Sequence, residues 1–301
     1  MYNVTVRRAS LVVCFYMGAC GGGNGINADA TLGDAPPSAR CDPTAAFGAP
    51  KQLTTLNGPT EDLGGRLSAD QLSIMFSRTN NDMTWDIYGA TRSSTNDAFD
   101  TPQVVGALNT IYSELWPAMT PDGLTVYFMS DRITPGTYGI WAAKRTSTTA
   151  SWNPPMAVAD LMTGDATPFV ANATGFYFAS GTRPGAGKND IFLATLDATG
   201  ALTMIGAVIG GVDTPASEDI PIVTADELHI FFARSNGTDF DVYEASRSAT
   251  SDGFGAATAV PGLAMAGFDE LPSWISPDGC DLYYSSAAGV TGSDLFVVSR
   301  P

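Results

Sequence analysis

Residues 113–132, SELWPAMTPDGLTVYFMSDR, followed by residues 139–145, GIWAAKR, recur in variant form along most of the chain. Aligned copies share a marker residue, a glycine in the first copy and a proline in the others. These markers are Gly65, Pro117, Pro168, Pro221 and Pro272, at spacings of 52, 51, 53 and 51 residues. A period near 50 residues predicts a propeller or a related array, because one such unit cannot bury its own apolar face.

Each copy predicts three β-strands. A short segment after the marker ends in a turn, most clearly in the Pro-Asp-Gly sequences at residues 121–123 and 277–279. Asp-Gly between apolar runs is a strong hairpin signal. The second strand carries an aromatic run such as Val126-Tyr127-Phe128, and the third begins with runs such as Asp190-Ile191-Phe192. Such β-branched and aromatic runs between turn residues are typical of strands.

A fourth strand is predicted after each triplet except the last. The stretches are residues 99–108, 152–161, 202–209 and 254–263. Residues 47–56 have the same pattern and precede the first copy, so we expect them to pair with the last triplet. The predicted fold is therefore all-β, a five-bladed propeller of four-stranded antiparallel blades over residues 47–301, closed by its N-terminal strand so that no blade has an unpaired edge.

These residues resemble the PD40, or WD40-like, β-propeller repeats of the TolB propeller and of many bacterial cell-envelope proteins. The resemblance covers residues 60–300 and rests on acid-x-x-Pro, Ser/Thr-Pro-Asp-Gly, the aromatic strand and Asp-Ile-Tyr. The turn departs from this pattern at Ala69-Asp70-Gln71 and Ala225-Asp226-Glu227. The resemblance implies the fold and says little about function. TolB resembles a six-bladed version with an extra domain, and this chain has room for neither.

The N-terminus resembles a lipoprotein signal over residues 1–19. Arg7 and Arg8 precede an apolar run, and Met17-Gly18-Ala19-Cys20 resembles a lipobox. We expect Cys20 to be lipidated and residues 20–46, rich in Gly, Asn, Asp, Ala and Pro, to form a flexible tether. The expected location is the bacterial cell envelope, lipid-anchored at the outer membrane, periplasmic or surface-facing. A plain secretory signal with a chance cysteine is the alternative.

The remaining cysteines are expected to pair. Cys14 lies in the signal and Cys20 is the expected lipid site, which leaves Cys41 and Cys280 in an oxidising compartment. Cys280 follows the first turn of the last blade, and Cys41 lies just before the strand that completes it. Both positions fall at one end of one blade, so we expect a disulfide there. Two unrelated thiols are the alternative.

Charge and motif content exclude several functions. The formal charge of −16 becomes −18 when Arg7 and Arg8 leave with the signal. This balance argues against nucleic acid and against direct binding to anionic lipid, so the membrane is expected to be a partner through the anchor alone. The only histidine, His229, is interpreted as an accessible strand residue. No Gly-x-Ser-x-Gly elbow, CxxC pair or phosphate-binding loop is present.

What remains is a periodic set of charges. Three residues before each marker lies an acid: Asp62, Glu114, Asp165, Glu218 and Asp269. An arginine follows the second strand in four copies: Arg78, Arg132, Arg183 and Arg234. The fifth copy has Ala287 there, which leaves Asp269 and Glu270 as the expected unneutralised acids. Both sets should lie on one face of the disc, either as structural pairs or as a carboxylate ring that binds a cation or a basic ligand. No cofactor is expected, and calcium is the one cation considered.

Two classes of function fit these residues. The first is a non-enzymatic binding or scaffold module that presents a face or channel mouth to an envelope protein, a peptide or a glycan. The alternative is a glycoside hydrolase or a lectin, since five-bladed propellers with acidic channel residues resemble the arabinanase and invertase-like families. Such hydrolases use two carboxylates across a sugar, whereas here the acids follow the repeat.

Overall fold

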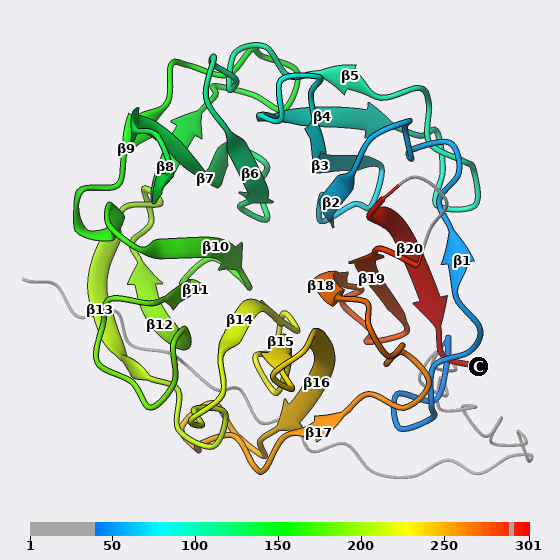
Figure 1. Cartoon of the computed structure of the whole chain (residues 1–301). Helices are drawn as coiled ribbons and strands as arrows, with labels where there is room; N and C mark the ends of the chain where they lie inside the picture. The colour runs from blue at the N-terminus through cyan, green and yellow to red at the C-terminus, as the bar shows by residue number, and fades with distance from the viewer. Residues whose placement is uncertain (1–39, 289–291) are drawn as a thin grey trace, which may run out of the picture. The chain divides into compact units, whose positions relative to one another are not determined.

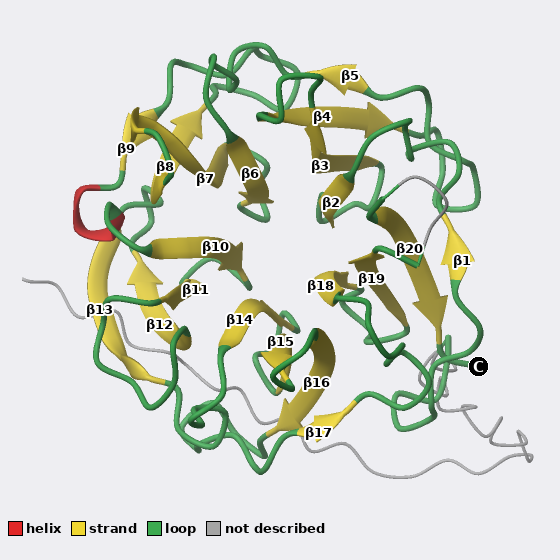
Figure 2. Ribbon diagram, viewed as in Figure 1, coloured by secondary structure: helices red, strands yellow, loops and turns green. Residues whose placement is uncertain are grey.

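The computed structural model describes residues 40–288 and 292–301, and over these residues the predicted all-β, five-bladed propeller is confirmed. Five four-stranded antiparallel sheets stand around a central axis (Figure 1). Almost all regular structure is strand, with one short 3₁₀ turn, η1 (Ala159–Leu161), among the described residues (Figure 2). The predicted signal, Cys20 and residues 21–39 of the predicted tether lie outside the described residues.

Each blade has an innermost, a second, a third and an outermost strand. The innermost strands of blades 1 to 5 are β2 (Asp62–Leu67), β6 (Glu114–Met119), β10 (Asp165–Val170), β14 (Glu218–Val223) and β18 (Glu270–Ile275). The second strands are β3 (Ser73–Thr79), β7 (Thr125–Thr134), β11 (Gly175–Ser180), β15 (His229–Ser235) and β19 (Asp281–Ser286). The third strands are β4 (Trp85–Thr91), β8 (Thr137–Lys144), β12 (Asp190–Leu196), β16 (Phe240–Ser246) and β20 (Asp294–Ser299). The outermost strands are β5 (Gln103–Val104), β9 (Met156–Ala157), β13 (Leu202–Val208), β17 (Thr258–Ala259) and β1 (Lys51–Gln52).

An aspartate fixes the turn between the first two strands in four blades. In blade 2, Asp122 accepts hydrogen bonds from the Thr120 hydroxyl at 2.6 Å and the Leu124 amide at 2.9 Å. Asp70, Asp226 and Asp278 make the same two bonds in blades 1, 4 and 5. The next residue takes positive φ, which Gly123 adopts without steric cost and Glu227 adopts at 57°. The Ser/Thr-x-Asp pattern is therefore a turn signal rather than a binding site.

The ring closes between the two ends of the described chain. β1 pairs with β20, with Lys51 opposite Val297 and Gln52 opposite Phe296, as predicted. Cys41 and Cys280 are joined by a disulfide, with their Cα atoms 5.8 Å apart. The N-terminal strand thus completes the C-terminal blade, and a covalent bond fastens it.

Four of the outermost strands are shorter than the predicted stretches, with only two paired residues each. In three of them a proline directly precedes the paired residues: Pro50, Pro102 and Pro155. Proline lacks the amide that a ladder needs and is confined to such edges. The outermost strand of blade 3 lacks this proline and runs for seven residues.

Apolar side chains fill the spaces between blades and part of the axis. Phe76, Phe128, Phe178, Phe232 and Tyr284 occupy one repeated position on the second strands, and all are buried. Leu115, Trp116, Met129, Ile220 and Ala233 form a separate buried group from blades 2 and 4. We call this group the axial apolar cluster. No helix among the described residues is long and apolar enough to cross a membrane.

Candidate functional site

Four blades pair the acid at the start of the innermost strand with an arginine that follows the second strand. The ion-pair distances are 2.7 Å for Arg78–Asp62, 3.1 Å for Arg132–Glu114, 3.0 Å for Arg183–Asp165 and 2.9 Å for Arg234–Glu218. The four carboxylate side chains are at most 3% exposed. These acids therefore do not form an open ring at the channel mouth, and the structural pairing considered from the sequence is present.

Each of these arginines also joins two blades. Arg132 donates to the carbonyl of Leu108 at 2.7 Å, at the end of the preceding blade's outer segment. Arg78 and Arg234 donate to the equivalent carbonyls, and Arg183 donates to the Asp160 carbonyl, one residue before the equivalent position. The guanidinium of Arg132 lies over the rings of Phe128 and Trp141 at 5.2 and 4.7 Å. Charge-assisted hydrogen bonds and cation–π contacts of this kind hold a guanidinium in place at low entropy cost.

Blade 5 differs, and the structure places Glu270, not Asp269, at the equivalent position. Glu270 lies opposite Ser286 just as Glu114 lies opposite Ser130. Sequence alignment on the marker failed because Pro272 occupies the place of Trp116, which has φ of 54°, and proline cannot adopt that conformation. Asp269 is exposed one residue earlier and accepts a hydrogen bond from the Phe240 amide at 2.9 Å.

Glu270 is a buried carboxyl with no basic partner among the described residues. It accepts hydrogen bonds from the Met265 amide and the Ser286 hydroxyl, each at 3.1 Å. Burial, followed by the neighbouring charges of Asp241 and Asp239, raises the pKa of Glu270 to about 7. Residues 287–291, Ala-Ala-Gly-Val-Thr, contain no basic side chain that could serve as the missing arginine.

The aromatic part of the arginine site is retained in blade 5. The rings of Tyr284 and Phe296 stack at 5.5 Å, at the positions of Phe232 and Tyr243 in blade 4. In blade 4 the Arg234 guanidinium lies over both rings, at 5.0 and 4.7 Å. Blade 5 therefore has the carboxyl and the ring pair of this site without a cation of its own in the described chain.

Further carboxylates lie on the same face near Glu270. The loop over residues 236–241 contacts the loop over residues 264–270, because Asp239 accepts a hydrogen bond from the Gly267 amide at 2.6 Å. Asp241 accepts one from the Asn236 side chain at 3.0 Å. Within residues 40–288 and 292–301, no ion pair joins Asp239, Asp241, Asp269 or Glu270 to a basic side chain. We call the side of the ring that carries these loops the acidic face.

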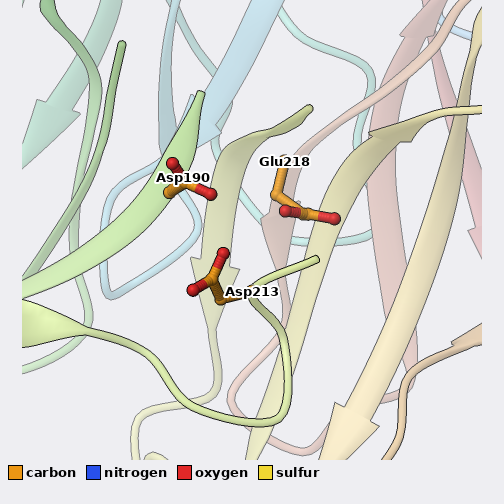
Figure 3. A group of neighbouring side chains, drawn as sticks. All are labelled: Asp190, Asp213 and Glu218. Atoms are coloured by element: carbon orange, nitrogen blue, oxygen red, sulfur yellow. The ribbon is translucent and has the colours of Figure 1, made fainter. Parts of the chain in front are cut away.

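A second acid group lies at the junction of blades 3 and 4 on this face. Asp190, Asp213 and Glu218 each place one carboxylate oxygen within 4.8 Å of the other two (Figure 3). Burial and the neighbouring Asp213 raise the pKa of Asp190. The residue equivalent to Asp213 in the closing segment of the ring is Asn57. The Asn57 side chain accepts a hydrogen bond from the Leu295 amide at 2.8 Å. Oxygen donors of this kind suit calcium, although Arg234 already neutralises Glu218.

Exposed apolar side chains also lie on the acidic face. Four large ones lie there, in loops or, for Ile133, near the end of β7: Met83, Ile111, Ile133 and Phe268. Ile111 is 81% exposed and Phe268, next to Asp269, is 42% exposed. The acidic face therefore combines unneutralised carboxylates with apolar contact area.

The opposite side, which we call the turn face, carries a second set of arginines that sequence reasoning missed. Each of these arginines follows a third strand and lies over an aromatic ring at 4.2–4.4 Å. The pairs are Arg92–Phe99, Arg145–Trp152, Arg247–Phe254 and Arg300–Phe47. The sequence pattern that could have predicted these pairs is an arginine just after the third strand, combined with an aromatic residue at the start of a predicted outermost strand.

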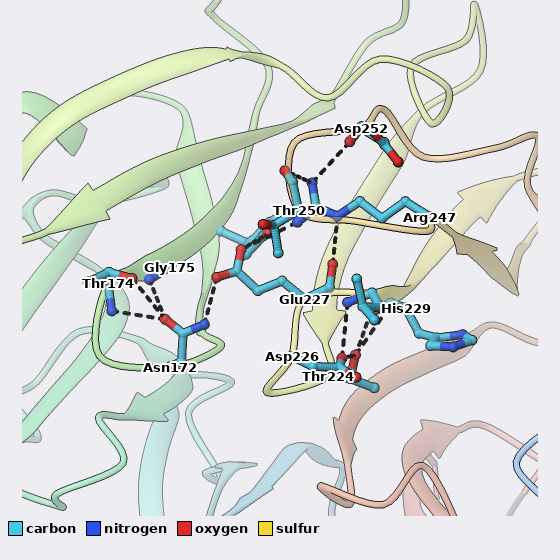
Figure 4. Close-up of polar contacts among 12 residues, drawn as sticks. Asn172, Thr174, Gly175, Thr224, Asp226, Glu227, His229, Arg247, Thr250 and Asp252 are labelled. Carbon is cyan, nitrogen blue, oxygen red and sulfur yellow. Dashed lines mark hydrogen bonds and ion pairs between the residues drawn. The ribbon is translucent and has the colours of Figure 1, made fainter.

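Several polar side chains on the turn face of blades 3 and 4 form hydrogen bonds within the fold (Figure 4). Arg247 Nε donates to the Glu227 carbonyl at 2.7 Å, and the Glu227 carboxylate accepts from Asn172 at 2.6 Å and from the Tyr177 hydroxyl at 2.5 Å. His229 Nδ1 lies 3.1 Å from Glu244, and the hydrogen bond to this carboxylate, followed by its charge, raises the pKa of the imidazole. His229 is thus half-exposed and paired, as a strand residue.

No protein-family model and no curated protein matches this sequence. Among solved structures, the chain is similar to the GH43_1 enzyme from Xanthomonas citri, with 13% identity, a TM-score of 0.56 and coverage of 84% of this chain and 90% of that one. It is also similar to α-L-arabinofuranosidase from Lactobacillus brevis, with 11% identity, a TM-score of 0.54 and coverage of 83% and 94%. TolB from Acinetobacter baumannii matches with 15% identity, a TM-score of 0.49 and 81% of this chain, which spans only 56% of the TolB chain. At these identities the similarity shows the propeller fold alone.

Proposed function

We propose that this propeller is a non-enzymatic binding module that captures a basic segment of a protein or peptide on its acidic face, at blades 4 and 5. The observation that carries the proposal is the incomplete arginine site of blade 5. Four internal copies of the site hold a guanidinium against a buried carboxylate, and the fifth has the carboxylate and the ring pair without an arginine. An arginine side chain from a partner has the chemistry that this site lacks.

Charge and apolar surface support the same class of partner. Asp239, Asp241 and Asp269 add negative charge beside Glu270, and the whole chain carries a formal charge of −16. Charge of one sign around a site attracts a ligand of the opposite sign and speeds its association. Phe268 adds an exposed apolar contact beside these acids. A basic segment with apolar flanking residues therefore fits this region better than a neutral ligand.

Proton release should accompany binding. The pKa of Glu270 is raised to about 7, so part of the population is protonated at neutral pH. A bound guanidinium favours the ionised carboxylate. The affinity for a basic ligand should therefore increase as the pH rises from 6 to 8, whereas a ligand held by apolar contacts alone should not respond.

The glycoside hydrolase or lectin stays the alternative. A hydrolase uses two carboxylates placed on either side of a glycosidic bond, and the repeated acids of this chain are buried and, in four blades, neutralised by arginine. A glycan array with a hydrolysis readout tests this alternative directly. Glycan binding or hydrolysis that persists in the Glu270→Gln variant would favour it.

The test of the proposal compares two peptides by calorimetry at pH 6 and pH 8. The probe is acetyl-Leu-Arg-Phe-Arg-Leu-amide, and its control has neutral citrulline in place of each arginine. One charge-assisted hydrogen bond contributes about 1.5–3 kcal/mol, or roughly tenfold to a hundredfold in affinity. We expect the arginine peptide to bind at least tenfold more tightly than the citrulline peptide, with the difference larger at pH 8.

Two variants locate the binding on the protein. Glu270→Gln should remove most of the preference for arginine, whereas Asp252→Asn, an equal change of charge on the turn face, should not. Calcium chloride added as a competitor tests whether a divalent cation uses the same carboxylates. Equal binding of both peptides, or an unchanged preference in Glu270→Gln, would refute the proposal.

A further inference from the structure

Arg66 breaks the repeat on the innermost strand of blade 1. It lies opposite Met75 in the same register as four apolar residues of the other blades. These residues are Ala118, Phe169, Ile222 and Trp274. A residue that departs from four apolar copies is not required by the shared architecture, so its charge needs an explanation of its own.

The Arg66 side chain reaches across the axis of the propeller. Its Nη1 atom donates to the carbonyl of Pro168, which lies on β10 of blade 3. Blades 1 and 3 are not neighbours in the ring (Figure 1), so this bond spans the central space. The guanidinium carbon lies 5.9 Å from the Trp116 ring centre and 5.3 Å from that of Phe169. Only 3% of the residue is exposed to solvent.

The guanidinium is short of partners. Nε and Nη2 are buried, and neither donates a hydrogen bond to any described residue. No carboxylate of the described residues forms an ion pair with Arg66. Burial lowers the pKa of Arg66 to about 9, so the side chain is still cationic at neutral pH. Ser273 Oγ, on the adjacent innermost strand β18, is also buried without a partner. A buried charge without an opposite charge is strongly unfavourable.

The two free nitrogens have a defined geometry. Nε and Nη2 lie on one edge of the planar guanidinium, and this edge donates two parallel hydrogen bonds to a carboxylate. The third nitrogen is occupied by the Pro168 carbonyl, which fixes the orientation of the group. The two aromatic rings lower the local dielectric, and electrostatic attraction is stronger there than in water.

We propose that Arg66 binds a small carboxylate on the axis of the propeller, through Nε and Nη2. The innermost strands begin at the acidic face and end at the turn face. Trp116 and Ile220 of the axial apolar cluster lie near the starts of β6 and β14, whereas Arg66 is the last residue but one of β2. The cluster therefore lies nearer the acidic face than Arg66 does. We therefore expect the carboxylate to enter from the turn face. This site is separate from Glu270 and takes a ligand of opposite charge.

Thermal unfolding of the full chain tests the site. Sodium formate is titrated against sodium chloride at constant ionic strength, and a ligand that binds only the folded state raises the melting temperature in proportion to RT ln(1 + [L]/Kd). We expect a rise with formate in the wild type. Arg66→Met keeps the length of the side chain and should abolish the rise. Arg66→Lys keeps the charge but lacks the two-donor edge, and should lose most of it.

A second measurement does not depend on the variants folding. Saturation transfer from the protein to formate should be observed by NMR in the wild type and should be displaced by acetate. Displacement by a tripeptide with a free C-terminus, and not by its amide, would identify a chain terminus as a source of the carboxylate. Displacement by acetate alone would identify a free small carboxylate. A melting temperature indifferent to formate, the same rise in Arg66→Met, or the absence of saturation transfer would overturn the proposal.

Discussion

Glu270→Gln should gain stability relative to the wild type as the pH rises from 5.0 to 8.5, whereas removal of a buried charge partner in the other blades should destabilise the protein at both pH values. The folded-state pKa of Glu270 is raised from 4.5 to about 7. A group with a raised pKa contributes fully to stability below pH 4.5, and this contribution is lost as the pH rises through 7. A difference of about 2.5 pKa units at about 1.4 kcal/mol each gives a ceiling of about 3.5 kcal/mol. Solvent near the surrounding loops screens the charge. We therefore expect ionisation of Glu270 to lower the free energy of unfolding of the wild type by about 1–2 kcal/mol at pH 8.5.

The assay is urea unfolding of the wild type and Glu270→Gln at pH 5.0 and pH 8.5. Loss of one hydrogen bond to Met265 or Ser286 costs about 1 kcal/mol at both pH values, so the change between the two pH values isolates the ionisation. Glu114→Gln is the matched control, because it leaves Arg132 without its partner and should destabilise by about 3 kcal/mol at both pH values. A difference between wild type and Glu270→Gln that stays constant from pH 5.0 to pH 8.5 would refute the reasoning.

Two further predictions concern the closing blade and the N-terminus. The Cys41–Cys280 disulfide closes a loop with a sequence separation of 239 residues, and its reduction should destabilise the protein by up to about 5 kcal/mol. Urea unfolding with and without reductant measures this loss. The double serine variant should be insensitive to reductant. Cys20→Ser should release the protein from the membrane fraction of cells, because attachment is expected to depend on acyl chains at that residue; membrane association that survives this change would count against the anchor.

The sequence was sufficient to predict the blades because each strand is specified locally and the pattern is repeated five times. An aromatic run, an Asp-containing turn and a marker residue recur with nearly constant spacing, so an ambiguous copy is resolved by its neighbours. Ring closure followed from counting strands, since residues 47–56 supply the one strand that the last blade lacks. The predicted outermost strands were too long because apolar spacing does not register the missing amide of a proline such as Pro102.

The site was harder to predict because it lies where the repeat changes. Alignment on Pro272 assigned the fifth acid to Asp269. In the structure Glu270 occupies this position, because Pro272 falls at the place of Trp116 and cannot adopt its positive φ. The repeat alignment shows Arg66 as a charged residue where other copies are apolar, but it could not predict the burial of Arg66, which depends on blade 3 lying across the axis. Contacts between distant parts of a chain are set by tertiary packing and not by local pattern.

Blade 5 can dispense with its arginine because another ion pair joins the same two blades. In blades 1 to 4 the acid–arginine pair ties the innermost strand to the end of the preceding blade. Blade 5 lacks this pair, so the junction of blades 4 and 5 is weaker on the acidic face. On the turn face, Arg300 of blade 5 lies 3.2 Å from Glu244 of blade 4 and also donates to the Pro43 carbonyl. This contact is nearly buried on the arginine side, so it is screened less than a surface pair. The turn face therefore holds the junction of blades 4 and 5, whose acidic side has no acid–arginine pair among the described residues.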